Sequence, residues 1–574
     1  MKRMLVLLLI ALALVALAAP MASAQAPAPK VTINGLIDNV ASYSQNIAIY
    51  NTGLFNRKDD MWYGRTRGRF DIVGEVGKAK GVLGLELDHV YGQTGSNVNG
   101  SNIVPAGGAA TTASQVGFGS DGGFELNTDS RGIIEIKWLY VEFPVPLIPI
   151  PTTARLGAQP WGAAATYKVA AYANGDFAGV NVVSQVTPNV KILGTYVQVD
   201  ESLVGTDTKH APATAPATGI VTTQNRGDDF AYVLSAEVTP FKGLDIKPMV
   251  SMFYAQGTTA LAARQGRGGI NTTTAFSTGS ADCGTVASAI AGVPPQSQIN
   301  PGTTCTRGGI NEYRYTVGLD SRLRMGPFSL DPTVLYQFGE RAVIAPANFA
   351  DSGAVPGRKY HPDLDAWLVD IRGGFQLGPL LLEGLVAYST GNSARDNTLN
   401  KVRYFQPLTT DTGYQADWGS QLTGLGIDYL NAWNEAGGRI AYPGVAIGWD
   451  KYGRIQVGAK ATYAITPDLS VMGGANVHWT AEKVDRNGLT VAGAGIVPVW
   501  DATNITSIHR DPSRYVGTEL FSVITWRFAP GLQWDNSFGY MFMGDALDAV
   551  TDPLAGPRNT NNPWMLTSRV RFSF

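Results

Sequence analysis

Apolar and polar residues alternate with a period of two along most of the chain after residue 30. In the last eleven residues the even positions are mainly apolar and the odd positions mainly polar, reading Trp564-Met-Leu-Thr-Ser-Arg-Val-Arg-Phe-Ser-Phe574. This period predicts a β-strand with two unlike faces. An apolar face that ends in aromatic residues, opposite a face that carries arginines, is typical of a strand between lipid and water.

The same pattern recurs in pairs of runs that are joined by short Gly, Pro or Asn turns. Eight such turns are predicted, at Gly77–Gly81, Pro144–Pro151, Thr187–Asn189, Pro240–Gly243, Met325–Pro327, Leu377–Pro379, Thr466–Asp468 and Ala529–Gly531. They join sixteen strands, and a first run from Val31 to about Tyr43 and the last run raise the count to eighteen, with sixteen as the alternative. An even count that places both termini at the short turns fits a single-chain barrel.

The predicted fold class is therefore all-β: a membrane-spanning, antiparallel, up-and-down β-barrel. The alternating runs are long enough, since a tilted strand needs about 9–11 residues to cross the hydrocarbon layer. A soluble sandwich is the alternative, but a free C-terminus that ends on an exposed Phe is unusual there. Pro248 and Pro332 lie inside predicted strands, and each removes a ladder donor, so we expect a bulge at each.

The N-terminus has a different pattern, which predicts an export signal. Lys2 and Arg3 precede a continuous apolar run from Leu5 to Ala18, and Ala22-Ser-Ala24 is a small-residue cleavage site. The apolar run is too short for a membrane-spanning helix. We expect residues 1–24 to be a signal peptide and residues 25–574 to form the exported barrel.

Composition supports one exported barrel domain rather than several soluble ones. Only 16% of the 574 residues are charged, and the chain contains 67 glycines, whereas soluble chains average about 25% charged residues and about 7% glycine. No linker or shift of composition divides the chain. The net charge of -2 provides no basic surface for nucleic acid.

The connections opposite the short turns are long, and function in such barrels is expected there. The longest are 256–312 and 391–451. The second contains an apolar stretch from Trp418 to Trp433, which we interpret as folding into the mouth or lumen; packing above the membrane is the alternative. Cys283 and Cys305 are the only cysteines and share the first of these loops, so we expect a disulfide in the exported protein.

With its signal peptide, hairpins of unequal turn length and last strand ending in Phe572 and Phe574, the chain resembles a Gram-negative outer-membrane porin. The two phenylalanines resemble the assembly signal of such barrels. The resemblance is one of architecture over the whole mature chain. It implies location in the outer membrane and passive diffusion of small hydrophilic solutes or ions. The implied partners are outer-membrane lipid, lipopolysaccharide and the barrel-assembly machinery, with a homotrimer as a further expectation.

Charged residues on the polar parity are the candidate pore lining. The basic candidates are Arg65, Arg67 and Arg69 in the second strand and Arg569 and Arg571 in the last, because both strands neighbour the first strand in a closed barrel. The acidic candidates are Glu75, Glu86 and Asp88, which are expected to form an opposing patch and with the arginines a transverse field. Strand pairing, or binding of lipopolysaccharide phosphates, is the alternative role for the arginines.

Other functions find less support in the sequence. Five histidines are present, and His478 shares the polar parity with Asn476, but no partner serine can be chosen for a hydrolase. No Cys-x-x-Cys-His motif for haem occurs, and no histidine or acidic cluster accompanies the cysteines as a metal site. We therefore expect no enzyme activity and no cofactor. A barrel that sheathes a cytochrome in an electron conduit, or serves an export complex, is the alternative function.

Overall fold

The computed structural model describes a set of ranges within the chain, and every structural statement below concerns them. They are residues 28–46, 60–90, 135–161, 166–168, 172–173, 176–201, 206–207, 223–224, 228–255, 309–344, 359–392, 401–408, 418–422, 452–484, 489–492, 495–498, 513–547, 551–552, 556–557 and 562–574. The predicted signal peptide (1–24) and disulfide (Cys283–Cys305) lie outside them.

Eighteen strands form the wall of the structure. They are β1 (Lys30–Gln45), β2 (Asp60–Val76), β3 (Ala79–Val90), β4 (Glu135–Pro144), β5 (Thr152–Pro160), β6 (Asp176–Thr187), β7 (Val190–Glu201), β10 (Asp228–Phe241), β11 (Leu244–Ala255), β12 (Gly309–Met325), β13 (Phe328–Ile344), β15 (Asp363–Leu377), β16 (Leu380–Ser389), β18 (Arg454–Ala464), β19 (Leu469–Val484), β22 (Ser513–Ala529), β23 (Leu532–Met543) and β26 (Trp564–Ser573).

Shorter elements lie in the long connections. They are β8 (Thr206–Asp207), β9 (Thr223–Gln224), β14 (Lys359–Tyr360), β17 (Lys401–Val402), β20 (Leu489–Ala492), β21 (Gly495–Pro498), β24 (Thr551–Asp552), β25 (Gly556–Pro557) and the 3-10 turn η5 (Asp545–Leu547). Within the described residues, no helix is long and apolar enough to cross a membrane.

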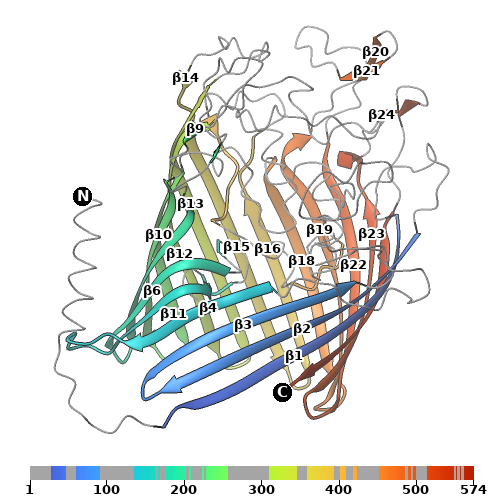
Figure 1. The fold of residues 1–574 in the computed structure, drawn as a ribbon. Helices are drawn as coiled ribbons and strands as arrows, with labels where there is room; N and C mark the ends of the chain where they lie inside the picture. Colours follow the sequence, from blue (N-terminus) through green and yellow to red (C-terminus); the bar gives the residue numbers. More distant parts are fainter. Residues whose placement is uncertain are drawn as a thin grey trace, which may run out of the picture.

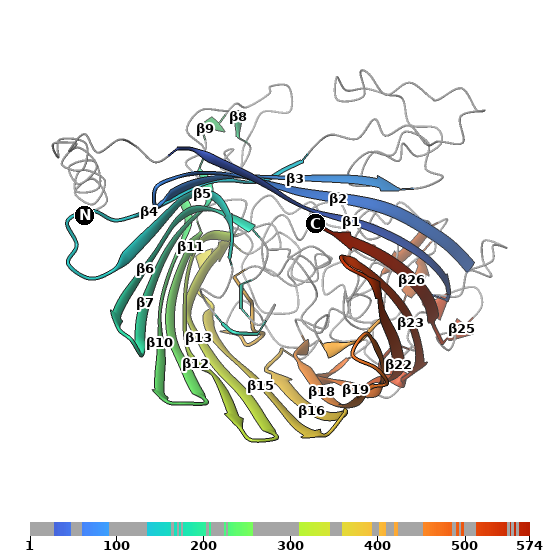
Figure 2. The same ribbon diagram turned by 90° about the horizontal axis from the view of Figure 1, so that it is seen from below.

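Each wall strand pairs antiparallel with the next, and the last pairs with the first. β1 forms ladders with both β2 and β26, the second running from Leu36 opposite Ser573 to Gln45 opposite Trp564. The sheet therefore closes into a ring, which Figure 2 shows from below. Closure removes the exposed sheet edges that would otherwise leave backbone groups unpaired in lipid. The predicted closed antiparallel barrel of eighteen strands is confirmed.

The hairpin turns lie at one end of the barrel, where the chain termini of the wall also meet. All eight predicted short turns join consecutive wall strands, and β1 begins and β26 ends at that same rim (Figure 1). Gly326 and Gly378 both have φ of 57° in two-residue turns, a left-handed conformation that glycine adopts without strain. The hairpins therefore follow from the turn residues in the sequence.

The expected bulges at Pro248 and Pro332 are wrong. Pro248 pairs with Leu319, and Pro332 pairs with Ile371, in ladders without a shift. In the ladder on the other side of each proline strand, pairs are missing around the proline, but the register is the same before and after this gap. A missing N–H donor thus interrupts one ladder locally, and the intact ladder on the other side keeps the strand in register.

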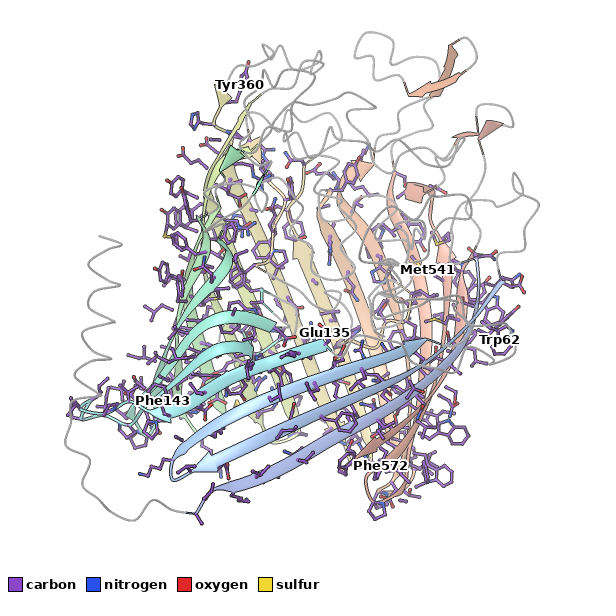
Figure 3. The ribbon with its side chains drawn as sticks, viewed as in Figure 1. Trp62, Glu135, Phe143, Tyr360, Met541 and Phe572 are labelled. Atoms are coloured by element: carbon purple, nitrogen blue, oxygen red, sulfur yellow. The ribbon has the colours of Figure 1, made fainter. Side chains whose placement is uncertain are left out.

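The two faces of the wall differ as their alternation predicts. In β26 the inward Met565 and Thr567 are 1% and 2% exposed, whereas the outward Leu566 and Phe574 are about half exposed. Large apolar side chains project outward around the wall, including Trp62 in β2 and Phe572 in β26, which are labelled in Figure 3. An apolar outer face and a polar inner face are what a barrel wall between lipid and water requires.

The terminal Phe574 completes the closure between β26 and β1. Its backbone N–H donates to the Gly35 carbonyl oxygen at 3.0 Å, and the Gly35 N–H donates to the Phe574 oxygen at 2.9 Å. A Cβ atom at position 35 would lie only 2.2 Å from the Phe574 ring, so the ring lies directly over this glycine. The chain end is therefore part of the wall, with its ring on the outer face.

Candidate functional site in the barrel lumen

Parts of two long connections lie against the inner face of the wall. The first inward segment comprises residues 166–168 and 172–173, between β5 and β6. Its Tyr172 hydroxyl donates to Ser251 Oγ of β11 at 2.7 Å, and its Lys168 ammonium lies 3.5 Å from the Asp320 carboxylate of β12. These wall residues are almost completely buried and face inward. The first inward segment is thus held to strands three to five places along the wall from β5 and β6, between which it lies in the chain.

The second inward segment, residues 401–408, lies beside the first one. The Gln337 side chain of β13 clasps the backbone of Gln406, accepting from its N–H at 3.0 Å and donating to its carbonyl oxygen at 2.9 Å. The Leu408 N–H donates to the Tyr172 carbonyl oxygen at 2.8 Å. The two segments therefore contact each other as well as the wall, and residues 401–408 of the connection 391–451 lie inside the barrel.

The third inward segment, residues 418–422, comes from the same connection and binds a different sector. The Glu519 carboxylate of β22 accepts from the backbone N–H groups of Gln421 at 2.5 Å and Leu422 at 2.9 Å, and from the Ser420 hydroxyl. Trp418 packs in a buried cluster on the inner face of β16, with the Lys460 ammonium 4.1 Å from its ring centre. Glu519 is fully buried, so this attachment lies inside the barrel.

These segments create an apolar core inside the barrel. Its members come from the inner faces of strands, from the first and second inward segments and from the residue after β5, and are Trp161, Tyr172, Ala173, Phe177, Val197, Ala231, Val233, Met249, Phe253, Leu335, Ala366, Leu368, Phe405 and Leu408. Burial of this surface stabilises the segments against the wall. The lumen is consequently filled along the sector from β6 to β15.

The predicted basic residues lie on the other side of the lumen, in what we call the charged sector: the inner faces of β23, β26, β1, β2, β3 and β4. Asp38 of β1 lies between two of the arginines. Arg569 of β26 donates to the Asp38 carboxylate through Nε and Nη2, both at 2.6 Å. On the other side of β1, Nη2 of Arg65 in β2 lies 3.6 Å from the same carboxylate. The two-bond geometry is the strong form of arginine–carboxylate pairing.

Glu86 of β3 is the second acidic centre of the charged sector. Arg67 Nη2 lies 3.1 Å from it, Arg69 Nε donates to it, and Lys137 of β4 lies 3.6 Å away. Lys137 is shared with Asp176 of β6, at 2.9 Å. The predicted acid Glu86 therefore lies in direct contact with the predicted arginines of the neighbouring strand.

Of the remaining predicted residues, Arg571 and Glu75 lie toward the short-turn rim, and for Asp88 only the position in the strand ladder is described. Arg571 pairs with Asp535 of β23 at 2.8 Å. Glu75 lies 3.9 Å from the Lys30 ammonium, at the first residue of β1. Asp88 is opposite Arg67 in the ladder of β2 and β3, and its side chain is outside the described atoms. The structure places the seven predicted charged residues whose side chains it describes in one sector.

Exposure differs among these arginines in a regular way. In β2 the exposure rises toward the short turn, since the side chains of Arg65, Arg67 and Arg69 are 2%, 5% and 32% exposed. Those of Arg569 and Arg571 in β26, which lie opposite the same β1 residues as Arg65 and Arg67, are 23% and 34% exposed. Ion pairs that are partly exposed are screened and weakly held, while buried pairs are costly to break. Solvent therefore reaches the arginines of β26 and, in β2, the arginine nearest the short turn.

Sequence reasoning missed Asp38, Lys137 and Asp535. It also missed Glu519, which holds the third inward segment. Asp38 carried a signal, because it lies on the inward parity of the strand between the two basic strands. Lys137 carried a weaker signal, because a bulge between β3 and β4 changes which positions of β4 face inward next to it. Glu519 could not be found by parity alone, because its role depends on residues almost a hundred positions away.

The described residues that were considered for catalysis or metal binding do not lie together in one site. His478 is fully buried on the inner face of β19, next to Gln456 across the ladder. Among the described residues, no group of three or more histidine, cysteine, aspartate or glutamate side chains is placed to hold a metal ion. The described part of the lumen thus has a charged sector on one side and, on the other, an apolar core with polar contacts that hold the inward segments.

Comparisons with known proteins gave matches only among solved structures; no protein-family model and no curated protein matches the chain. It is similar to OccK11 (OpdR) of Pseudomonas aeruginosa, at 9% identity and a TM-score of 0.42, over 95% of this chain and 96% of that one. The outer membrane protein opdK of Pseudomonas aeruginosa matches at 10% and 0.39, over 95% and 99%. A BenF-like porin from Pseudomonas fluorescens Pf-5 matches at 10% and 0.41, over 95% and 99%.

Proposed function

We propose that the protein is an outer-membrane porin that lets small hydrophilic solutes or ions diffuse through its lumen. The observation that carries the proposal is the closed wall of eighteen strands, which is apolar outside and charged inside. Arginine side chains that face lipid at the membrane midplane cost about 2–4 kcal/mol each. Placing partly exposed arginines on the inner face is therefore consistent with water inside the barrel.

The conducting route would follow the charged sector. The opposite sector is filled by the first and second inward segments, whose wall partners are buried. The guanidinium groups of Arg69, Arg569 and Arg571 remain 23–34% exposed. Polar solutes would thus pass along β26, β1, β2 and β3, beside alternating guanidinium and carboxylate groups.

Conductance of the purified protein in a planar bilayer tests the function. A porin should give discrete, persistent, ohmic steps in potassium chloride. The expected conductance is lower than that of an unobstructed barrel of eighteen strands, because the inward segments occupy part of the cross-section. If correctly folded, heat-modifiable protein gave no conductance, the porin function would be refuted, and the electron-conduit sheath could then be tested by co-purification of a cytochrome.

We further propose a weak preference for anions, set by the solvent-exposed arginines. The double variant Arg69→Gln with Arg571→Gln should move the reversal potential in a potassium chloride gradient toward cations. The shift should be larger at 0.1 M salt, where charges are screened over about 10 Å, than at 1 M, where the length is about 3 Å. Arg324→Gln is the matched control, because Arg324 is 51% exposed and paired with Asp331 at another hairpin.

An unchanged reversal potential at low salt would contradict the preference, and the arginines would then serve strand pairing. Arg65 and Arg67 are less useful for the test, because removing one partner of a buried ion pair destabilises by about 3–5 kcal/mol. The neutralisation of Arg65, Arg67 and Arg69 together would therefore mix a fold defect with a change of selectivity.

The proposed partners follow from the two faces and the last strand. The outward apolar side chains would contact outer-membrane lipid, with lipopolysaccharide at the long-loop end. The last strand, with Phe572 and Phe574 on its outer face, would be recognised by the barrel-assembly machinery. The homotrimer stays a prediction, which the mass of the detergent-solubilised protein would test.

A further inference from the structure

The inner wall carries a second arginine centre, away from the charged sector. Arg314 of β12 is 1% exposed and faces inward. Its Nη1 donates to Gln406 Oε1 of the second inward segment at 2.6 Å and lies 3.4 Å from the Glu312 carboxylate. The face of its guanidinium covers the Phe253 ring at 5.0 Å. One nitrogen of this buried side chain is therefore fully engaged.

The other two nitrogens of Arg314 meet no acceptor in the part of the chain that the structure describes. Nε and Nη2 are both buried and lack a hydrogen-bond partner among the described residues. These two N–H groups form the side edge of the guanidinium, which binds anions with two parallel hydrogen bonds. A buried donor without an acceptor costs free energy, so such an edge calls for a ligand.

Gln406 supplies a third donor of the same kind. Its Oε1 accepts from Arg314 Nη1 and from Arg341 Nη2, at 2.6 and 2.9 Å, which fixes the amide with its oxygen toward both arginines. Its Nε2 is buried and has no partner among the described residues. Three donor atoms, two of Arg314 and one of Gln406, are thus left without a hydrogen-bond partner among the described residues, while the neighbouring Glu312 carboxylate lies 3.4 Å from Arg314 Nη1.

The geometry points to a site for one small anion, bound by Arg314 Nε and Nη2 and Gln406 Nε2 between β12 and the second inward segment. Donors without acceptors favour an anion over a hydroxyl or amide group, which would bring donors of its own. Arg314 and Arg341 contribute two positive charges, and Glu312 one negative charge, so the site keeps a net positive charge. A halide or a small carboxylate supplies the required acceptor.

Binding at this site would join the second inward segment to the wall. Gln406 is already clasped through its backbone by Gln337, and an anion would add a bridge from its side chain to Arg314. The inference does not depend on conduction, since it concerns an anion resident in the folded protein and not the solute that crosses. Its failure would therefore leave the proposed function untouched.

Equilibrium binding of radioactive chloride to the purified full-length protein in detergent tests the site. Wild type should bind one chloride per chain saturably. Arg314→Lys keeps the positive charge but lacks the side edge, and should weaken binding at least tenfold. Arg155→Lys is the matched control, because Nε and Nη2 of Arg155 already donate to Glu142 at 3.0 and 2.7 Å; its chloride binding should equal that of wild type.

A second variant protects the test against misfolding. Gln406→Glu places a carboxylate oxygen where Nε2 lies, so the side chain itself becomes the anion and chloride binding should be lost in a folded, heat-modifiable barrel. Crystals grown in bromide should show an anomalous peak at Arg314 in wild type and none in Gln406→Glu. Competition by formate would identify a carboxylate as the better ligand, and no competition would identify a halide.

Two results would overturn the proposal. Non-saturable binding, or a bromide peak found only at crystal concentration, would mean an adventitious ion only. Chloride binding that is unchanged in both Arg314→Lys and Gln406→Glu would place the anion elsewhere.

Discussion

Glu519 is the residue whose replacement should most directly change the bore. Its carboxylate is fully buried on β22 and holds the third inward segment through two backbone N–H groups and one hydroxyl. Glu519→Ala removes both carboxylate oxygens, which together accept all three hydrogen bonds. The amides of Gln421 and Leu422 would then have to leave the wall and find water.

The size of the effect follows from these contacts. Hydrogen bonds to a charged group are worth about 1.5–3 kcal/mol each, so three give about 5–9 kcal/mol. Burying the carboxylate costs several kcal/mol, which leaves a net contribution of roughly 2–4 kcal/mol. At 1.4 kcal/mol per factor of ten, the held state should lose about 30- to 700-fold in population relative to a released state.

Single-channel recording in a planar bilayer measures this loss. Glu519→Ala should show larger steps or frequent transitions to a larger conductance, and Glu519→Gln, which keeps one oxygen acceptor, should lie between it and wild type. Glu142→Ala is the control, because Glu142 is an inward carboxylate bonded only to Arg155 and Lys80 among the contacts described. Conductance and gating in Glu519→Ala that match both wild type and this control would show that the third inward segment does not restrict the bore.

Three further outcomes are expected. Phe574→Asp should impair insertion of the barrel, because it puts a charge on the outer face of the closing strand; normal levels of heat-modifiable protein in the outer membrane would contradict this. Non-reducing peptide mapping should find Cys283 linked to Cys305, and free thiols at both positions would refute the loop disulfide. Burial lowers the pKa of the Lys168 ammonium, although Asp320 opposes the shift. The first inward segment therefore binds fewer protons when it is docked than when it is released, so its attachment should strengthen as pH rises toward the usual lysine pKa. Lys168→Met should abolish this pH dependence, which is measured in single-channel closed times.

The alternation of polar and apolar residues predicted the strands of the barrel wall well, because the environment of each wall residue depends only on the face of the strand on which it lies. An inward residue contacts water or polar groups and an outward one contacts lipid, so a period of two records the face of every residue. The turns were equally local: Gly326 and Gly378 follow from the backbone conformation that a two-residue hairpin needs. The bulges at Pro248 and Pro332 were predicted wrongly, because the ladder on the intact side of each proline keeps the register.

The interior was harder to predict, because its contacts join residues far apart in the sequence. The apolar composition after Trp418 indicated entry into the lumen, yet not that Glu519 would hold this segment. Nothing local in the connection between β5 and β6 signals that Lys168 reaches Asp320, more than 150 residues away. Such contacts depend on the diameter of the closed ring and on which strands it places opposite each other, and neither is recorded in the period of a single strand.

The charged sector shows why counting arginines misjudges the field in a barrel. Each of the five predicted arginines has a carboxylate within 3.6 Å, on a neighbouring strand. Paired charges largely cancel at distances beyond their separation, and salt shortens the remaining field to about 10 Å. A solute in the lumen would therefore sense the guanidinium edges that solvent reaches, at Arg69, Arg569 and Arg571, more than the sum of the charges. Selectivity in this barrel should accordingly depend on which member of each ion pair is exposed, a property that register and closure determine together.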